Sequence, residues 1–332
     1  MRATVKDVAQ RAGVSPKTVS NVVNGTFPVS PQTRSRVERA LDELDYVPNL
    51  TARGLRNGRT GVVALALPDL ATSYSAELAH HFVVAAQKRG LNVQIEETAW
   101  GGHREHELLS RARAQLIDGL ILNPVLLETS AVQRGVSLPP VVLIGEVDQP
   151  LADHVWHDNV AASREMTTML VEEGHRRIAV LGTMESETSR LREKGYRQAM
   201  AKAGLEASPE LSIATRSWNP AGGAAAMHRY LDEHELPEAV FCFTDAMAIG
   251  ALSVLWAAGY RVPDDVSVVG YDDVIDASYT VPALTTVRFE KRDLAETALD
   301  LLIQRIADHE REITSVMVRH SIISRLSTRP RG

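Results

Sequence analysis

The first 24 residues contain two short runs whose apolar positions repeat at helical spacing. In the first run, Val5, Val8 and Ala12 fall on one side of a helix. Gly13 suits the left-handed residue with which many helices end. Ser15 is a favoured N-cap residue and opens the second run, which continues to residue 24. The pattern therefore predicts two helices joined by a tight turn.

The second predicted helix has two different faces. Val19, Val22 and Val23 make an apolar side, whereas Lys17 and Asn21 lie among side chains that can bond to phosphates or base edges. Such a pair is typical of the helix-turn-helix, whose second helix enters the DNA major groove. An ordinary helical hairpin with a solvated face explains the pattern equally well, so both interpretations stand at this point.

A third helix and a linker follow. Ser30 and Pro31 repeat the combination of cap and proline, and Val37 belongs to the inner stripe of this helix. Pro48 then breaks the pattern, because proline disfavours a helical residue before it. The next stretch, 49–57, can form a helix but is too short to be stable alone in water. We expect it to order only on a partner.

From residue 62 onward, short apolar strands alternate with helices in two successive series. Such alternation predicts parallel sheets, and two series of similar length predict two α/β lobes with a ligand cleft at the strand ends. The predicted strands are 62–67, 91–95, 119–122, 141–144, 154–156, 177–181, 211–213, 239–243, 266–270, 285–288, 314–320 and 322–325. The predicted helices are 75–89, 105–115, 162–173, 191–203, 221–233, 246–258 and 291–306.

Charge is distributed unevenly along the chain. The 332 residues are 44% hydrophobic and 23% charged, which is ordinary for a soluble protein of two or three domains. Residues 1–60 carry a net charge of +5, which leaves −11 for the rest of a chain whose total is −6. A basic module on an acidic body indicates a polyanionic partner for that module alone.

Several other classes of protein find little support. The chain has one cysteine, Cys242, and neither an apolar leader nor a run long enough to span a membrane, so we expect a cytoplasmic location. Phosphate loops, dinucleotide-binding glycine motifs and nucleophile elbows are missing, which argues against an enzyme, and no cofactor is predicted. The histidine pairs 80–81 and 103–106 are interpreted as solvated helix residues rather than metal ligands, and Cys242 as buried packing.

Motifs at both ends of the chain resemble the LacI/GalR family of bacterial repressors, which includes the lactose- and purine-repressor types. The resemblance covers essentially the whole chain and selects the helix-turn-helix over the plain hairpin. It rests on Asp7-Val-Ala, Ala12-Gly-Val-Ser, Thr18-Val-Ser, Asn24, Tyr46-x-Pro-Asn49, Ala52-Arg-x-Leu55, Val269-Gly-Tyr-Asp-Asp273 and Pro282-Ala-Leu-Thr-Thr286.

The resemblance implies a three-helix DNA-binding domain, a hinge helix and a two-lobed core like that of periplasmic binding proteins. It also implies a homodimer on a pseudo-palindromic operator, and a chain that ends without a heptad tail favours a dimer over a tetramer. The expected domains are 1–48, 49–60 and 61–327, with an N-lobe of 61–159 and 290–319 and a C-lobe of 160–289 and 320–327.

In the DNA-binding region, the resemblance assigns base reading to Pro16, Lys17 and Asn21, where many relatives carry arginine at the position of Asn21. Leu55 is the expected wedge in the minor groove, beside Ala52, although packing on the core surface is the alternative. Expected backbone contacts are Thr4, Ser15, Thr18, Ser20, Asn24, Thr33 and Asn49.

Effector candidates are polar and aromatic side chains that follow strand ends and match family positions. They are Tyr74, Ser75, Asn123, Asp158, Arg192, Trp218, Thr244, Asp272 and Phe289. An aromatic face with a planar arginine and a carboxylate is the usual chemistry for a sugar. A structural role for Trp218 and a salt bridge between Arg192 and Asp272 remain open, and Asp273 is interpreted as structural.

The predicted function is a DNA-binding transcriptional regulator, most simply a repressor, controlled by a small molecule between the lobes. A sugar is the expected effector, and a purine, nucleoside or sugar phosphate is the alternative. A sugar-binding transport protein fits the lobes, but the DNA module and the missing leader count against it.

Overall fold

The computed structural model describes residues 3–24, 27–46, 59–99, 102–114, 117–124, 139–146 and 150–331. The chain divides into two compact units, residues 1–60 and 61–332. No helix in these described ranges is both long and apolar enough to cross a lipid bilayer.

The first unit contains three short helices around a small apolar core. They are α1 (Val5–Ala12), α2 (Pro16–Asn24) and α3 (Pro31–Glu43). Val8, Val19 and Val37, one from each helix, are fully buried against one another. Gly13 ends α1 with a φ of 64°, the left-handed conformation that glycine adopts without steric cost, so the predicted turn is confirmed.

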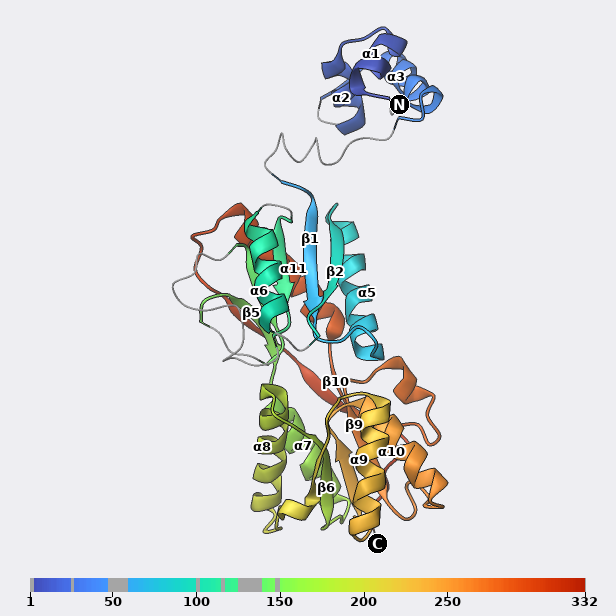
Figure 1. Ribbon diagram of the computed structural model, residues 1–332, viewed down its shortest axis with the longest axis vertical. Helices are drawn as coiled ribbons and strands as arrows, with labels where there is room; N and C mark the ends of the chain where they lie inside the picture. The colour runs from blue at the N-terminus through green and yellow to red at the C-terminus, as the bar shows by residue number, and fades with distance from the viewer. Residues whose placement is uncertain are drawn as a thin grey trace. The chain divides into compact units, whose positions relative to one another are not determined.

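The second unit consists of two lobes, each built on a six-stranded sheet (Figure 1). The N-lobe sheet has the order β11-β5-β4-β3-β1-β2, and all of its strand pairs are parallel. Its strands are β1 (Val62–Leu67), β2 (Asn92–Glu97), β3 (Gly119–Leu122), β4 (Val141–Ile144), β5 (Asp153–His157) and β11 (Ser315–Val318).

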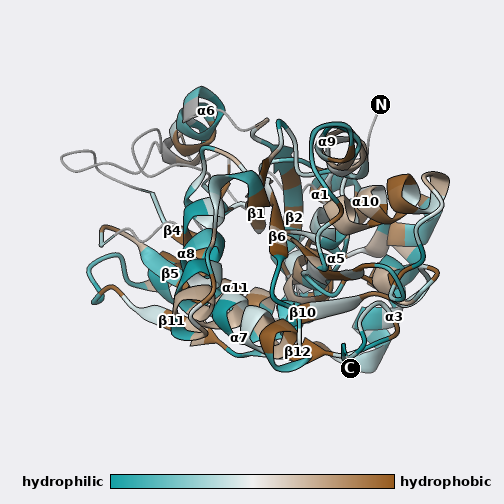
Figure 2. Cartoon of the chain, turned by 90° about the horizontal axis from the view of Figure 1, so that it is seen from below, coloured by the Kyte–Doolittle hydropathy of each residue, from teal (hydrophilic) through white to brown (hydrophobic). Residues whose placement is uncertain are grey.

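Helices cover both faces of the N-lobe sheet. On one face, Leu65 and Ile121 pack with α5 (Ser73–Lys88) and α11 (Lys291–Ala307). On the other face, Ala66 and Leu122 pack with α6 (Gly102–Arg113). Because successive strand residues point to opposite faces, strands buried on both sides read as unbroken apolar runs. The brown colour of β1 and β6 in Figure 2 shows this character.

The C-lobe repeats the same design. Its sheet has the order β12-β10-β9-β8-β6-β7, and only β12 among these strands runs antiparallel to its neighbour. The strands are β6 (Ile178–Thr183), β7 (Ser212–Ala214), β8 (Ala239–Cys242), β9 (Ser267–Tyr271), β10 (Thr285–Phe289) and β12 (His320–Ile323). The helices are α7 (Asn159–Glu172), α8 (Glu187–Lys202), α9 (Pro220–Glu233) and α10 (Asp245–Ala257), with short 3-10 turns η1 (Pro209–Leu211) and η2 (Ile275–Ser278).

The chain crosses between the lobes three times. The crossings follow β5, β10 and β11, and each leads into an element of the other lobe. After β12, the C-terminal segment stays on the C-lobe, where Val268 N–H donates to the Ser327 carbonyl and Arg331 pairs with Glu238 at 2.9 Å. The C-lobe therefore extends beyond the predicted limit at residue 327.

Several predicted boundaries are wrong by a few residues. The helix predicted at 191–203 begins at Glu187, because Ser186 caps it by accepting a hydrogen bond from Ser189 N–H. The strand predicted at 211–213 is split into η1 and β7. The last two strands, predicted at 314–320 and 322–325, are β11 and β12, which begin later and earlier, respectively. Local caps and turns determine where these helices and strands begin and end, and apolar periodicity does not predict those end residues.

Candidate functional site

In the first unit, helix α2 presents one face to the core and the other to solvent. Val19 and Val22 are buried, whereas Pro16 and Lys17 are exposed. Three further predicted DNA contacts, Thr18, Ser20 and Asn21, are partly exposed on the same helix. The side chains expected to read bases therefore remain accessible on the surface of this unit.

Four of the predicted backbone contacts lie at helix N-termini. Thr4 shares a capping box with Asp7, whose N–H donates to the Thr4 hydroxyl. Ser15 Oγ accepts from Thr18 N–H at 3.1 Å, and Thr33 Oγ1 accepts from the Ser30 hydroxyl at 2.9 Å. Helix N-termini carry free N–H groups and a positive dipole end, which suits them to phosphate.

The remaining DNA predictions cannot be placed in the same way. Asn24 ends α2, but its side chain is not among those described. Asn49, Ala52 and Leu55 lie outside the described residues.

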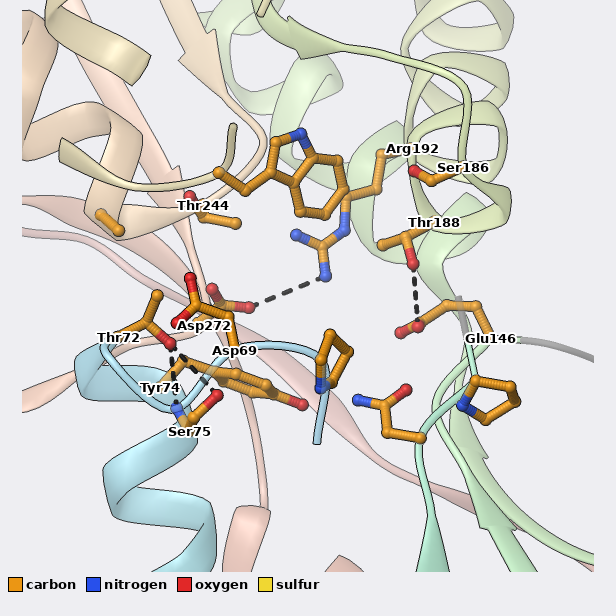
Figure 3. A pocket seen from close by; sticks show the side chains of 15 residues that line it. Asp69, Thr72, Tyr74, Ser75, Glu146, Ser186, Thr188, Arg192, Thr244 and Asp272 are labelled. Carbon is orange, nitrogen blue, oxygen red and sulfur yellow. Dashed lines mark hydrogen bonds and ion pairs between the residues drawn. The ribbon is translucent and has the colours of Figure 1, made fainter. Parts of the chain in front are cut away.

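In the core, both lobes line the cavity shown in Figure 3. Its empty volume is about 720 Å³, a figure that includes open solvent. The N-lobe contributes Pro68, Asp69, Thr72, Tyr74, Ser75, Asn123, Pro124 and Glu146. The C-lobe contributes Ser186, Thr188, Arg192, Trp218, Thr244, Ala246 and Asp272.

Seven of the nine predicted effector residues line this cavity, because parallel strands end at the same edge of their sheet. Asn123 directly follows β3, Thr244 follows β8 by two residues, and Asp272 directly follows β9. Tyr74 and Ser75 lie in the first turn of α5, which follows β1. Long-range topology thus brings together side chains that are widely separated in the sequence.

Arg192 is held by contacts on several sides. It is 3% exposed; its Nε donates to Asn159 Oδ1 at 2.8 Å, and its Nη1 donates to the Phe243 carbonyl. Its Cζ lies 3.5 Å from the centroid of the Tyr271 ring, a cation–π arrangement. Nη2 is 3.7 Å from Asp272 Oδ1, so the salt bridge that the sequence left open as an alternative is present at the cavity wall. The guanidinium is therefore preorganised, with little freedom to lose when a ligand binds.

Asp272 lies at the cavity wall in an unusual backbone conformation. Its φ is 107°, which L residues rarely adopt, and its N–H donates to the Val287 carbonyl at 2.9 Å. Burial raises the pKa of Asp272 to about 7, although Arg192 and Lys291 favour the charged form. Hydroxyl groups of a ligand could donate hydrogen bonds to Asp272 and so stabilise its charged form, which burial disfavours.

Trp218 lines the cavity and also makes a hydrogen bond to the backbone of the C-lobe. Its Nε1 donates to the Gly182 carbonyl at 2.9 Å, and the Arg192 Cζ lies 5.6 Å from its ring centroid. The hydrogen bond fixes the orientation of the indole, which is partly exposed. Trp218 and Tyr74 therefore supply one aromatic side chain from each lobe.

Two predicted effector residues do not line the cavity. Asp158 caps α7, where its side chain accepts a hydrogen bond from Ala161 N–H at 2.8 Å. Phe289 is buried at the second lobe crossing, where it stacks on His157 with ring centroids 4.1 Å apart. Both residues lie at lobe crossings, after strands that end near the cavity, but their side chains are not part of the cavity lining.

Sequence reasoning also missed residues that line the cavity. The most informative is Glu146, which follows β4 by two residues and thus obeys the strand-end rule that found Asn123 and Asp272. Ser186 and Thr188 lie at the N-terminus of α8, which was predicted to begin too late. An N-cap serine before an acidic first turn was the available signal for this helix start.

Glu146 is bonded from two directions. Oε1 accepts from Asn159 Nδ2 and Oε2 accepts from the Thr188 hydroxyl, both at 3.0 Å. Although burial opposes ionisation, the pKa of Glu146 is lowered, because His157, Arg192 and these hydrogen bonds favour the carboxylate. The Thr188 bond joins the two lobes directly across the cavity (Figure 3).

The structure also places the cysteine and one of the histidine pairs that the sequence analysis considered. Cys242 is fully buried on β8, and burial raises the pKa of its thiol, as expected for packing rather than nucleophilic chemistry. The rings of His80 and His81 are 5.7 Å apart on α5. Within the described ranges, no group of three or more His, Cys, Asp or Glu side chains is arranged to hold a metal ion.

Comparison with known families matches both units of the chain. Residues 4–49 match the bacterial regulatory proteins of the lacI family, and residues 167–328 match the periplasmic binding protein-like domain. A curated relative, the HTH-type transcriptional repressor PurR of Aliivibrio fischeri, is 33% identical over 98% of this chain and 99% of its own. The PurR repressor of Salmonella paratyphi B is 36% identical over 98% and 96%.

Solved structures agree with these matches. The Lac repressor dimer bound to operator and the anti-inducer ONPF has a TM-score of 0.83 at 29% identity, covering 99% of each chain. The CelR regulator in complex with cellobiose has a TM-score of 0.72 at 33% identity, covering 98% of this chain and 100% of that one. The predicted fold class is confirmed, and the chain belongs to the LacI family of DNA-binding bacterial transcriptional regulators.

Proposed function

We propose that this regulator is a homodimeric repressor whose affinity for a pseudo-palindromic operator is controlled by a small molecule in the cavity between the lobes. The observation that carries the proposal is the cavity itself, which both lobes line with fixed polar and aromatic side chains. A ligand that contacts both lobes binds one lobe arrangement better than another, and so shifts the population between them.

A sugar is the effector class that the cavity chemistry supports best. Arg192, Asp272 and Glu146 offer charged hydrogen-bonding groups, while Tyr74 and Trp218 offer rings for the C–H faces of a sugar. The similarity to a regulator solved with cellobiose points in the same direction. A purine or nucleoside is the second candidate, because a planar base also fits against aromatic side chains.

The DNA assignments are part of the same proposal. Pro16, Lys17 and Asn21 would read base edges, and Ser15, Thr18, Ser20 and Thr33 would contact phosphates together with Thr4, Asn24 and Asn49. Their exposed or partly exposed positions at helix N-termini and on α2 support this for the residues whose side chains are described. Ala52 and Leu55 would enter the minor groove from the linker.

Two measurements test the proposal. Selection from random pseudo-palindromic DNA gives an operator, and fluorescence anisotropy gives its affinity. Thermal shift against cellobiose, monosaccharides, sugar phosphates, nucleosides and purine bases then identifies an effector, since a ligand at 100 times its dissociation constant adds about 2.7 kcal/mol of stability. The proposal fails if no operator emerges, or if compounds that stabilise the protein leave operator affinity unchanged.

Asp272→Ala separates the effector site from the DNA site. We expect the effector found in this screen to lose its influence on operator affinity, because the variant lacks a carboxylate of the cavity wall. Operator affinity without effector should stay within about threefold of wild type, since the substitution lies in the other unit. Asp232→Ala, an exposed carboxylate on α9, is the matched control. An unchanged response in Asp272→Ala would move the effector site elsewhere.

A further inference from the structure

Asp272 reaches the cavity from a turn in which two consecutive residues adopt a backbone conformation that favours glycine. The φ angle is 107° at Asp272 and 46° at Asp273, directly after β9. Asp272 is 5% exposed, and its carboxyl group faces Arg192 in the cavity wall (Figure 3). Such a conformation persists only where surrounding contacts hold it, and it is concentrated at active sites and ligand sites. The contacts that hold this turn therefore also determine where the Asp272 carboxyl group lies.

The three backbone N–H groups of residues 272–274 all have partners on other segments of the C-lobe. The first donates to the Val287 carbonyl at 2.9 Å, the second to Thr286 Oγ1 at 3.4 Å and the third to Asp245 Oδ2 at 2.9 Å. Val287 and Thr286 lie on β10, whereas Asp245 is the first residue of α10. The turn is therefore held from two different elements.

Asp245 holds the turn although it is not part of the cavity lining. It is fully buried, and its Oδ1 accepts a hydrogen bond from the Thr286 hydroxyl at 2.6 Å, while its Oδ2 accepts from Val274 N–H. A Cβ at Gly270 would overlap Asp245 Oδ1, so the carboxyl group packs directly against the strand that leads into the turn. One side chain thus joins the turn to the neighbouring strand β10.

We propose that Asp245 is a positioning residue of the effector site, which holds the turn after β9 and thereby directs the Asp272 carboxyl group into the cavity. Thr286 supports Asp245 in this role. Without these contacts, the turn would relax toward the negative φ angles that L residues prefer, and the carboxyl group would leave the buried wall. The inference rests on the proposed function, because the direction of Asp272 matters for regulation only if the cavity binds an effector.

An NMR titration of the Asp272 carboxyl group in the full-length protein tests the inference without any small molecule. Protein labelled with 13Cγ-aspartate is titrated between about pH 3.5 and 9, and the Asp272 resonance is assigned by its loss in Asp272→Asn. Burial raises the pKa of Asp272 to about 7, so a carboxyl group that moves toward water should titrate at a lower pH. The charged groups that act most strongly on Asp272 stay in place in the variants compared below, and they are Arg192, Lys291, Glu146 and Glu77.

Two substitutions of Asp245 separate its contacts from its charge. Asp245→Ala removes both contacts, and we expect it to lower the pKa of Asp272 by about 1 or more. Asp245→Asn keeps an acceptor for Val274 N–H and a donor for the Thr286 oxygen, so the pKa of Asp272 should stay within about 0.3 of wild type. Both variants lack the same ionisable group, and the difference between them therefore reports the contacts.

A third variant tests the turn without changing any charge. Thr286→Val removes the hydroxyl that bonds to Asp245 and accepts from Asp273 N–H, and it should lower the pKa of Asp272 by about 0.5 or more. Thr167→Val is the matched control, because Thr167 is also fully buried and its hydroxyl bonds to the Ser163 carbonyl within α7. It should leave the pKa of Asp272 unchanged.

The inference is overturned if Asp245→Ala titrates like wild type, if Asp245→Asn lowers the pKa as much as Asp245→Ala does, or if Thr286→Val has no more effect than Thr167→Val. A wild-type pKa near 4 would also overturn it, because the carboxyl group would then not be held in the buried wall. If Asp245→Ala does not fold, Thr286→Val and its control decide. A wild-type protein that binds no operator would contradict the proposed function, whereas the titrations would still decide whether Asp245 positions Asp272.

Discussion

Asp272 and His157 are buried ionisable residues whose pKa values move in opposite directions. The pKa of Asp272 rises from an ordinary 3.8 to about 7, and that of His157 falls from 6.5 to about 4, in both cases chiefly because burial disfavours the charged form. Folding therefore takes up a proton at Asp272 between about pH 4 and 7. At His157, folding releases one between about pH 4 and 6.5.

These two effects oppose each other in the free energy of unfolding. As pH rises through these windows, Asp272 lowers the stability of the fold and His157 raises it. We therefore expect Asp272→Asn to gain stability relative to wild type as pH increases from 4.5 to 7.5. His157→Phe should lose stability relative to wild type between pH 4.5 and 6.5. Each difference should be on the order of 3 kcal/mol, because one pKa unit corresponds to about 1.4 kcal/mol.

Urea unfolding at four pH values between 4.5 and 7.5 measures these slopes. Only the change with pH is compared, because Asp272→Asn also leaves Arg192 without its charged partner and so shifts the whole curve. A parallel curve for Asp272→Asn would mean that the Asp272 carboxyl titrates normally in the fold.

At the scale of elements, the same turns that start helices also line the cavity. Thr72, Ser186 and Thr244 cap α5, α8 and α10 by accepting a hydrogen bond from the third residue after each cap. All three also line the cavity. Each cap comes shortly after a parallel strand, so the strand–turn–helix unit delivers a hydroxyl to the sheet edge where ligands bind. Helix capping and ligand binding are therefore served by the same residues.

The packing of α7 on α8 depends on a glycine one turn after Arg192. A Cβ at Gly195 would overlap the Val160 carbonyl oxygen and lie 2.8 Å from the Cβ of Ser163, both on α7. We expect Gly195→Ala to destabilise the core by about 1–3 kcal/mol, because backbone atoms must move apart. Thermal or urea unfolding measures the loss. Lys194→Ala, on the exposed face of the same helix, should stay within about 0.5 kcal/mol of wild type.

Gly195→Ala should also affect the site, because α8 carries Arg192 and Thr188. A shift of α8 would weaken the response to an effector more than the affinity for operator. If Gly195→Ala were as stable as wild type, α7 and α8 could accommodate a Cβ at this position, and the predicted overlap with Val160 would be wrong.

At the scale of the whole molecule, a regulator must join a DNA-binding unit to a ligand-binding unit. The linker predicted to order on DNA contains Leu55, which lies outside the described residues. If Leu55 wedges into the minor groove, Leu55→Ala should weaken specific operator binding by about tenfold or more, because the unstacking contact is lost. Non-specific binding, which depends mainly on phosphate charge, should change less than about twofold.

Anisotropy titrations with operator and with scrambled DNA at fixed salt measure the two affinities. Leu326→Ala, which truncates an exposed leucine of the core unit, is the control and should leave both unchanged. Equal losses on the two DNAs would contradict the wedge and would favour packing of Leu55 on the protein.

The sequence by itself determined the elements and the family. Gly13, the caps and the apolar periodicity act over a few residues, so helices α1 to α3 and most strands were predicted within a few positions. The motifs near both ends of the chain also sufficed for the family, which the comparisons confirm. The strand-end rule placed Asn123, Thr244 and Asp272 correctly at the cavity, because the topology of parallel sheets is itself regular.

Only the tertiary structure decided how side chains at those ends are used. Phe289 stacks on His157, 132 positions earlier in the numbering, and Arg192 bonds to Asn159 and to the Phe243 carbonyl. Glu146 obeyed the strand-end rule, yet its bond to Thr188 depends on how the two lobes approach each other. Local periodicity reports which face of an element is buried. Contacts between distant segments depend on the packing of whole elements, and they set which groups face the cavity and which stabilise the crossings.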